Sequence, residues 1–179
     1  MPDVLSFPHQ VSRLVFEPGQ AYEKFRDRYE AAVPPADPRS LGAIPEWHSR
    51  WPRPGTAGLE PGAHGFVMYW RADLTPPVTA AGELRPCTAY LMGADVIPEP
   101  CYRDDPAVLL YSRLRTLIYI GRNDRTQFAV EQPSTALAGL AGPAVVQLGI
   151  DLDRQLAGLL DSLGVGTGMM RRVPSPVSG

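Results

Sequence analysis

This chain contains five short apolar runs, and each has the length and composition of a β-strand. They cover residues 11–17, 64–71, 86–92, 114–120 and 126–131. The last two are separated by the polar stretch 121–125, which predicts a β-hairpin. In the run 64–71, strict alternation would place Tyr69 and Arg71 on the same face of the sheet.

Two other stretches have the spacing of an amphipathic helix. In the first, Tyr22, Phe25, Tyr29 and Val33 recur on one face, and Pro34-Pro35 ends the pattern. The second begins at Pro143, ends at Gly164 and carries eight residues on one face: Val145, Leu148, Gly149, Leu152, Leu156, Leu159, Leu160 and Leu163. Leucine at this density must be buried, so the helix is expected to pack on the sheet.

These elements predict an α+β fold, a two-layer sandwich with helices packed on one face of a mixed or antiparallel sheet of about five strands. We expect a single domain over residues 1–165 and a disordered tail over 166–179. The segment 34–62 is rich in Pro and Gly but carries Trp47 and Trp51. Two interpretations are open. The segment is a lid or binding loop, or it is a meandering loop whose tryptophans pack against the core.

Composition excludes several classes of partner. The 179 residues carry a net charge of -2, and the basic residues are scattered, so a nucleic-acid partner is not expected. No apolar stretch approaches the ~20 residues of a membrane span. The N-terminus lacks the features of a signal peptide, which favours a cytoplasmic location and free thiols at Cys87 and Cys101.

A succession of short motifs runs through the middle of the chain. The motifs are Gly65-Phe-Val-Met-Tyr-Trp-Arg71, Tyr90-Leu-Met-Gly93, Tyr102-Arg103, Leu109-Leu-Tyr111, Leu114-Arg-Thr116 and Gln132-Pro-Ser-Thr135. In this order, with the Leu-rich helix after them, they resemble the DUF302 family of uncharacterised bacterial proteins. The resemblance implies a compact α+β fold and no established activity. Members are often dimers, so a homodimer is a hypothesis here.

The chain departs from the family pattern in one loop. Ala94-Asp95 stand where relatives usually show Asn followed by His or Pro, and Asp104 stands where a histidine is common. Pro98, Pro100 and Cys101 interrupt a segment that is usually smoother. The stretch 94–101, together with Asp104, is therefore the predicted place for a function particular to this protein.

No metal or cofactor is predicted. The three histidines lie on distant segments, without the close pairs typical of metal ligands, which also disfavours a heme or metal carrier. The alternating glycines of 164–168 follow a helix, whereas a phosphate-binding loop opens one.

General acid–base chemistry fits the polar residues better. Histidine titrates near neutral pH, Tyr and Arg can stabilise an oxyanion, and a carboxylate can orient or exchange protons. The candidate catalytic residues are His64, Tyr69, Arg71, Tyr102, Arg103 and Asp104. The alternative is that these charges form ion pairs that hold loops to the sheet.

A second set of residues is predicted to contact a substrate: Trp47, Trp51, Tyr90, Cys101, Arg115 and Tyr119. Cys101 is either a thiol activated by the neighbouring arginine or a buried core residue. A further set on the strands is Phe66, Met68, Trp70, Met92 and Leu117. Either some of them line an apolar pocket beneath the segment 34–62, or they are ordinary core residues.

The leading hypothesis is a cofactor-independent enzyme that acts by acid–base or oxyanion chemistry on a small carbonyl-containing molecule, in a biosynthetic pathway. The alternative is a non-catalytic small-molecule-binding or stress-linked module.

Overall fold

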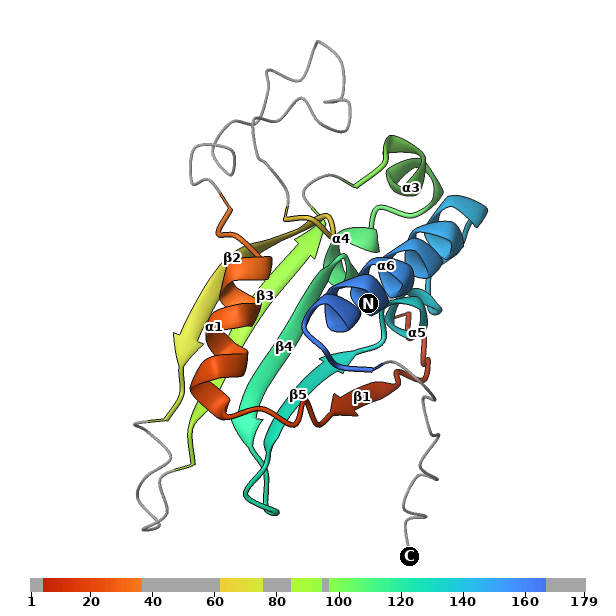
Figure 1. Cartoon of the computed structure of the whole chain (residues 1–179). Helices are drawn as coiled ribbons and strands as arrows, with labels where there is room; N and C mark the ends of the chain where they lie inside the picture. Colours follow the sequence, from red (N-terminus) through yellow and green to blue (C-terminus); the bar gives the residue numbers. More distant parts are fainter. Residues whose placement is uncertain (1–4, 37–61, 76–84, 95–96, 167–179) are drawn as a thin grey trace, which may run out of the picture.

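One antiparallel sheet organises the protein. The computed structural model describes residues 5–36, 62–75, 85–94 and 97–166. The sheet order is β1-β5-β4-β3-β2, and every neighbouring pair is antiparallel (Figure 1). The strands are β1 (Arg13–Phe16), β2 (Phe66–Asp73), β3 (Cys87–Ala94), β4 (Arg113–Ile120) and β5 (Thr126–Glu131).

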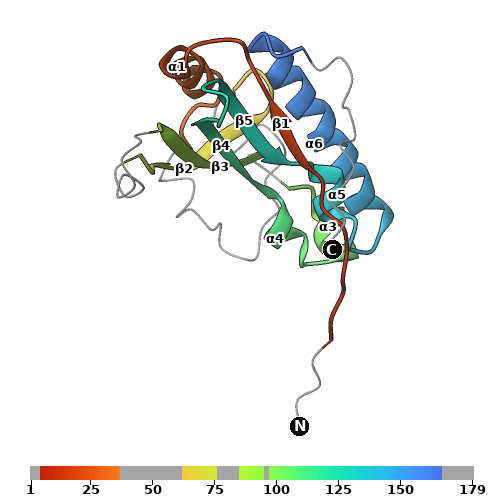
Figure 2. The same cartoon turned by 90° about the horizontal axis from the view of Figure 1, so that it is seen from below.

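The two long helices lie on the same face of this sheet, as Figures 1 and 2 show. They are α1 (Tyr22–Ala32) and α6 (Pro143–Ser162). Three short helices stand near the N-terminal end of α6: α3 (Glu99–Asp104), α4 (Val108–Tyr111) and α5 (Pro133–Leu137). The predicted two-layer α+β sandwich is therefore confirmed.

The five predicted strands and both predicted long helices are present, with ends shifted by a few residues. Helix α3 contains the end of the stretch 94–101 and Asp104, and α5 begins shortly after β5. Most of the segment 34–62 and nearly all of the tail 166–179 lie outside the described residues, so the lid and the disordered tail stay predictions. The single domain over 1–165 also stays a prediction.

The core lies between the sheet and the two long helices. Strands β3, β4 and β5 turn large side chains toward the helices. Among them are Tyr90, Met92, Ile118 and Phe128, each at most 2% exposed. The core also contains hydroxyl groups. Tyr29 of α1 is fully buried, and its hydroxyl lies 2.9 Å from the Thr116 hydroxyl and donates to the Met92 sulfur. Pairing of these groups offsets the cost of burying them.

A β-bulge in β2 changes which residues face the helices. The register of β2 against β3 shifts between Met68 and Trp70, so Tyr69 is the extra residue. Beyond the bulge, Arg71 lies opposite Tyr90 on the helix-covered face, and Trp70 lies opposite Leu91 on the other face. The expectation that Tyr69 and Arg71 share a face is therefore wrong, because strict alternation does not survive a bulge.

Candidate functional site

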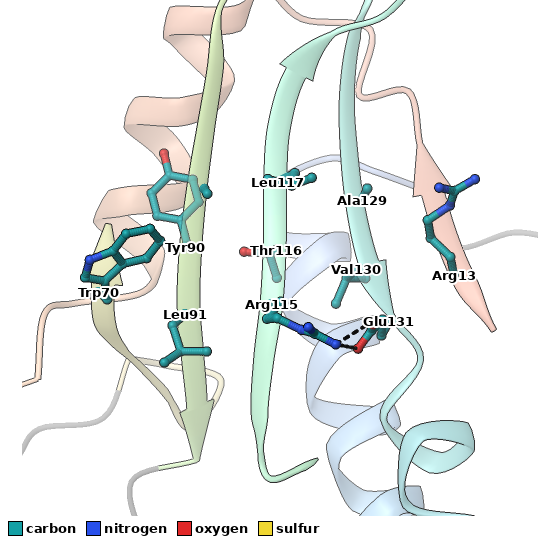
Figure 3. Close-up of a pocket in the computed structure, with 11 residues that line it drawn as sticks. Arg13, Trp70, Tyr90, Leu91, Arg115, Thr116, Leu117, Ala129, Val130 and Glu131 are labelled. Atoms are coloured by element: carbon teal, nitrogen blue, oxygen red, sulfur yellow. Dashed lines mark hydrogen bonds and ion pairs between the residues drawn. The ribbon is translucent and has the colours of Figure 1, made fainter. Parts of the chain in front are cut away.

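The face of the sheet opposite α1 and α6 carries a hollow of about 460 Å³, shown in Figure 3. We call this side of the sheet the open face. Trp70, Leu91, Arg115, Leu117 and Arg13 are prominent among the residues that line the hollow. Trp70 is 52% exposed and Leu117 is 38% exposed, so two large apolar side chains of this face are open to solvent.

Strand register explains how these residues come together. Trp70 pairs with Leu91, Leu91 pairs with Arg115, and Arg13 pairs with Glu131. Arg115 reaches Glu131 across the β4–β5 pair. One row of side chains therefore crosses all five strands, with an indole at one edge and an arginine at the other. We call this the Trp70–Arg13 row.

The next row along the strands supplies the floor of the hollow. Ala72 pairs with Ala89, Ala89 with Leu117, and Leu117 with Ala129, while Val15 completes the row on β1. Three of these five side chains are methyl groups. Because the floor is low and the Trp70–Arg13 row is tall, the open face is concave and apolar at this point.

A second hollow of about 390 Å³ adjoins the first. The two share Arg13, Leu117 and Ala129, and the second also has Arg85 and Tyr119 in its lining. Arg85 donates to the Gly121 carbonyl and lies 3.7 Å from the Asp124 carboxylate. Together the two hollows are lined by three arginines and one glutamate, so the concave face has an excess of positive charge.

The arginine at the centre of the row keeps donors available. Arg115 contacts both carboxylate oxygens of Glu131 at 2.9 Å, and both contacts come from the same nitrogen, Nη2. Its side chain is 76% exposed. Arg13 makes no ion pair with any other described residue. Both guanidinium groups therefore have unused N–H donors.

Arg71, a predicted catalytic residue, lies on the opposite side of the sheet. Its Nε donates to the Glu30 carboxylate at 2.7 Å, and the Tyr90 hydroxyl donates to the same oxygen at 2.9 Å. Burial, with Glu30 beside it, raises the pKa of Tyr90 far above the usual tyrosine value. This cluster joins α1 to β2 and β3, and it holds the Tyr90 phenol in its neutral form.

Tyr69 lies against an arginine that the sequence did not single out. The guanidinium of Arg113 lies 3.7 Å from the centre of the Tyr69 ring. Its Nη1 also donates to the Tyr69 hydroxyl and, at 2.8 Å, to the Ala94 carbonyl. Burial raises the pKa of Tyr102, and the nearby Arg113 charge opposes that rise. Arg113 therefore contacts one of the six catalytic candidates directly and acts on a second through its charge.

Arg103 and Asp104 have contacts elsewhere. Arg103 is exposed and donates to Glu99 one helical turn away, at 2.6 Å. Asp104 accepts from the backbone N–H of Ala144 in the first turn of α6 at 2.8 Å. A Cβ atom added to Gly158 would lie 3.4 Å from Nδ1 of His64, which places His64 beside α6. None of these three lines either hollow on the open face.

The residues predicted to contact a substrate divide into three groups. Arg115 and Tyr119 line the hollows, and Tyr90 borders the first hollow while its hydroxyl lies on the helix side. Cys101 is buried, with its sulfur 3.5 Å from the Ala144 carbonyl oxygen, and burial raises the pKa of its thiol. Trp47 and Trp51 lie outside the described residues.

Of the predicted apolar pocket residues, Trp70 and Leu117 line the first hollow, whereas Phe66, Met68 and Met92 belong to the core. Sequence reasoning missed Arg13 and Glu131 as site residues. Alternation along β4 and β5 could have placed Arg115 and Glu131 on one face, but the pairing of β1 with β5 was not predicted.

Within the residues that the structure describes, there is no group of three His, Cys, Asp or Glu side chains that could hold a metal ion. Likewise, none of the described helices is both long enough and apolar enough to cross a membrane.

A comparison with solved structures identifies the architecture. The crystal structure of an uncharacterised conserved DUF302 protein from Bacillus stearothermophilus matches with a TM-score of 0.54, over 83% of this chain and 95% of that one. The chain has a DUF302 fold. The sequences are 16% identical, and the DUF302 resemblance seen in the motifs is confirmed at the level of the fold. No protein-family model matches the sequence, and no curated protein matches it either.

Proposed function

We propose that this DUF302-like protein binds a small, largely apolar molecule on the open face of its sheet. The observation that carries the proposal is the 460 Å³ hollow, which is bordered by an exposed tryptophan, floored by alanines and crossed by an ion pair. Its volume lies in the range of small-molecule sites, which are mostly apolar and have few polar groups.

Binding without catalysis has more support than acid–base catalysis. Arg71, Arg103 and Asp104 each have a local partner, respectively Glu30, Glu99 and the Ala144 backbone. The six catalytic candidates are also absent from the lining of both hollows. Of the two hypotheses from the sequence, the small-molecule-binding module therefore fits the geometry better. A cytoplasmic location, a stress-linked or biosynthetic role and a homodimer stay predictions.

The cofactor-independent enzyme keeps one supporting observation, which is the contact of Arg113 with Tyr69, together with the effect of the Arg113 charge on Tyr102. An arginine beside a phenol could stabilise an oxyanion. If this cluster is catalytic, Tyr102→Phe would abolish turnover of a substrate found by metabolite depletion, while leaving the melting temperature nearly unchanged. Equal depletion by the variant and the wild type would rule the cluster out.

The binding proposal is tested by filling the hollow. Ala89 lies on its floor, so Ala89→Phe would occupy the space with little strain, since the added ring points to solvent. Val146→Phe on the exposed side of α6 is a matched control. In a thermal-shift screen of metabolites, compounds that stabilise the wild type are expected to stabilise Val146→Phe equally and Ala89→Phe not at all. Equal stabilisation of both variants would place the ligand elsewhere.

A further inference from the structure

Building on the binding function proposed above, we infer that the ligand of the open face is an organic anion, with one carboxylate held by Arg115 and an apolar body that reaches toward Trp70.

The charge of the Trp70–Arg13 row selects the anion. Arg13 and Arg115 flank Glu131 on the two neighbouring strands, so the row has two positive charges and one negative. Glu131 balances one arginine. A ligand carboxylate bound at Arg115 would bring the net charge of the row to zero, whereas a neutral ligand would cover an uncompensated charge and a cation would add to it.

The geometry of Arg115 makes room for that carboxylate. Nη2 makes both contacts to Glu131, so the N–H groups of Nε and Nη1 stay available. They point in different directions, and each can donate one hydrogen bond to a ligand carboxylate. The side chain is 76% exposed, so a ligand can approach without displacing Glu131.

The positions of the apolar residues indicate the length and character of the rest of the ligand. Trp70 lies two strands from Arg115, with Leu91 between them, which corresponds to roughly 10 Å across the sheet. The methyl groups of Ala89 and Ala129 and the Leu117 side chain form the floor beside this line. A flat or extended apolar body of that length would lie on the floor and stack its far end against the indole ring.

A second copy of the chain is a poorer occupant of this face. Two copies packed face to face would bring two rows together, each with an excess of positive charge, in an interface where water is excluded. Like charges so placed oppose association. A small anion neutralises the same surface, and this difference favours it over self-association.

The test uses two probes of the same shape, naphthalene-2-carboxylate and naphthalene-2-carboxamide, titrated into the whole protein by calorimetry at low ionic strength. We expect the carboxylate to bind about tenfold more tightly than the amide, and the preference to shrink in high salt. Arg115→Met should reduce the preference to less than about twofold, because the remaining contacts are apolar. Arg154→Met is the matched control. That arginine is equally exposed and ion-paired, but it lies on α6, so the tenfold preference should be kept.

The remaining outcomes separate a wrong ligand from a wrong site. If both probes bind the wild type equally and Ala89→Phe abolishes binding, the hollow is a binding site but does not select an anionic ligand. If neither probe binds, or if Ala89→Phe leaves binding intact, the proposed function fails and the inference fails with it. If the carboxylate preference survives Arg115→Met, the assignment of Arg115 is wrong. If the protein is a dimer that Leu117→Asp dissociates, a second copy occupies the face.

Discussion

The carboxylate of Asp104 accepts a hydrogen bond from the backbone N–H of Ala144, so the end of α3 caps the beginning of α6. The first N–H groups of a helix have no partner within it, and a negative charge there is favoured by the helix dipole. The residue at the N-cap of α6 is Gly142, which has no side chain to fill this role. A Cβ at Gly142 would collide with the Asp104 carboxylate, so glycine is needed for the contact.

Replacement of Asp104 should therefore change stability. We expect Asp104→Ala to lower the free energy of unfolding by about 1 kcal/mol, the usual cost of a lost cap, and Asp104→Asn to lose less, since an amide oxygen still accepts the hydrogen bond. Urea unfolding measures both. Asp27→Ala is the control, since Asp27 is exposed on α1 with only its neighbour Arg26 as partner, and it should shift stability by under ~0.5 kcal/mol. An equal loss in Asp27→Ala and Asp104→Ala would argue against the cap.

Two adjacent residues of β4 test the assignment of the sheet faces. Ile118 is fully buried under the helices, whereas Leu117 is on the open face. We expect Ile118→Ala to cost about 2–5 kcal/mol, as large-to-small changes in a core do, and Leu117→Ala to cost under ~1 kcal/mol. Thermal or denaturant unfolding of the two variants measures these losses in the free energy of unfolding. Comparable losses would show that something covers the open face in the free protein.

The buried tyrosines predict how stability responds to alkali. Burial raises the pKa of Tyr29 and Tyr90 well above the ordinary tyrosine value. Above pH ~10 the unfolded chain loses these phenolic protons while the native state keeps them. Native stability should therefore be unaffected by these groups below about pH 9, and should fall above pH 10 by up to about 1.4 kcal/mol per pH unit for each tyrosine.

Tyr29→Phe provides the comparison for the alkaline response. The variant should lose stability near neutral pH, because the Thr116 hydroxyl loses its partner, at a cost of about 1–3 kcal/mol. Its dependence on pH above 10 should be shallower than that of the wild type, since one titrating group is gone. A wild-type protein whose phenols all ionise together near pH 10, followed by absorbance, would contradict the burial of these groups.

The two thiols should differ in accessibility. Cys101 is 1% exposed, whereas Cys87 is partly accessible on β3, and burial raises the pKa of both thiols. We expect a disulfide reagent to modify Cys87 slowly in the native protein and Cys101 only after unfolding. The Cys87→Ala variant isolates the second thiol. Rapid labelling of that variant under native conditions would support the activated Cys101 thiol that was one of the two alternatives from the sequence.

Much of the fold followed from periodicity, because α6 has a leucine stripe and the strands have alternating or continuous apolar runs. The helix α5 was not recognised, since five residues are too few to establish a helical period. The bulge at Tyr69 left no clear signal in the sequence, so the faces of Trp70 and Arg71 could not be assigned in advance.

The site was harder to predict than the fold. Arg115 lines the first hollow, but the other residues of its row come from the four other strands, and their alignment depends on pairing between distant segments. The polar residues that look chemically active, such as Arg71 and Asp104, instead have their partners on α1 and α6. A sequence shows which residues are charged, and it does not show which of them already have a partner.

The position of β1 in the sheet has a consequence for synthesis. Among the described strands, β1 leaves the ribosome before the others, but it pairs with β5, which is made after the other three. The edge of β5 must therefore stay unfilled until a segment made much earlier returns to it, a closure of high contact order that is expected to be slow. Until then the nascent chain carries an unpaired strand edge, the kind of surface that chaperones cover.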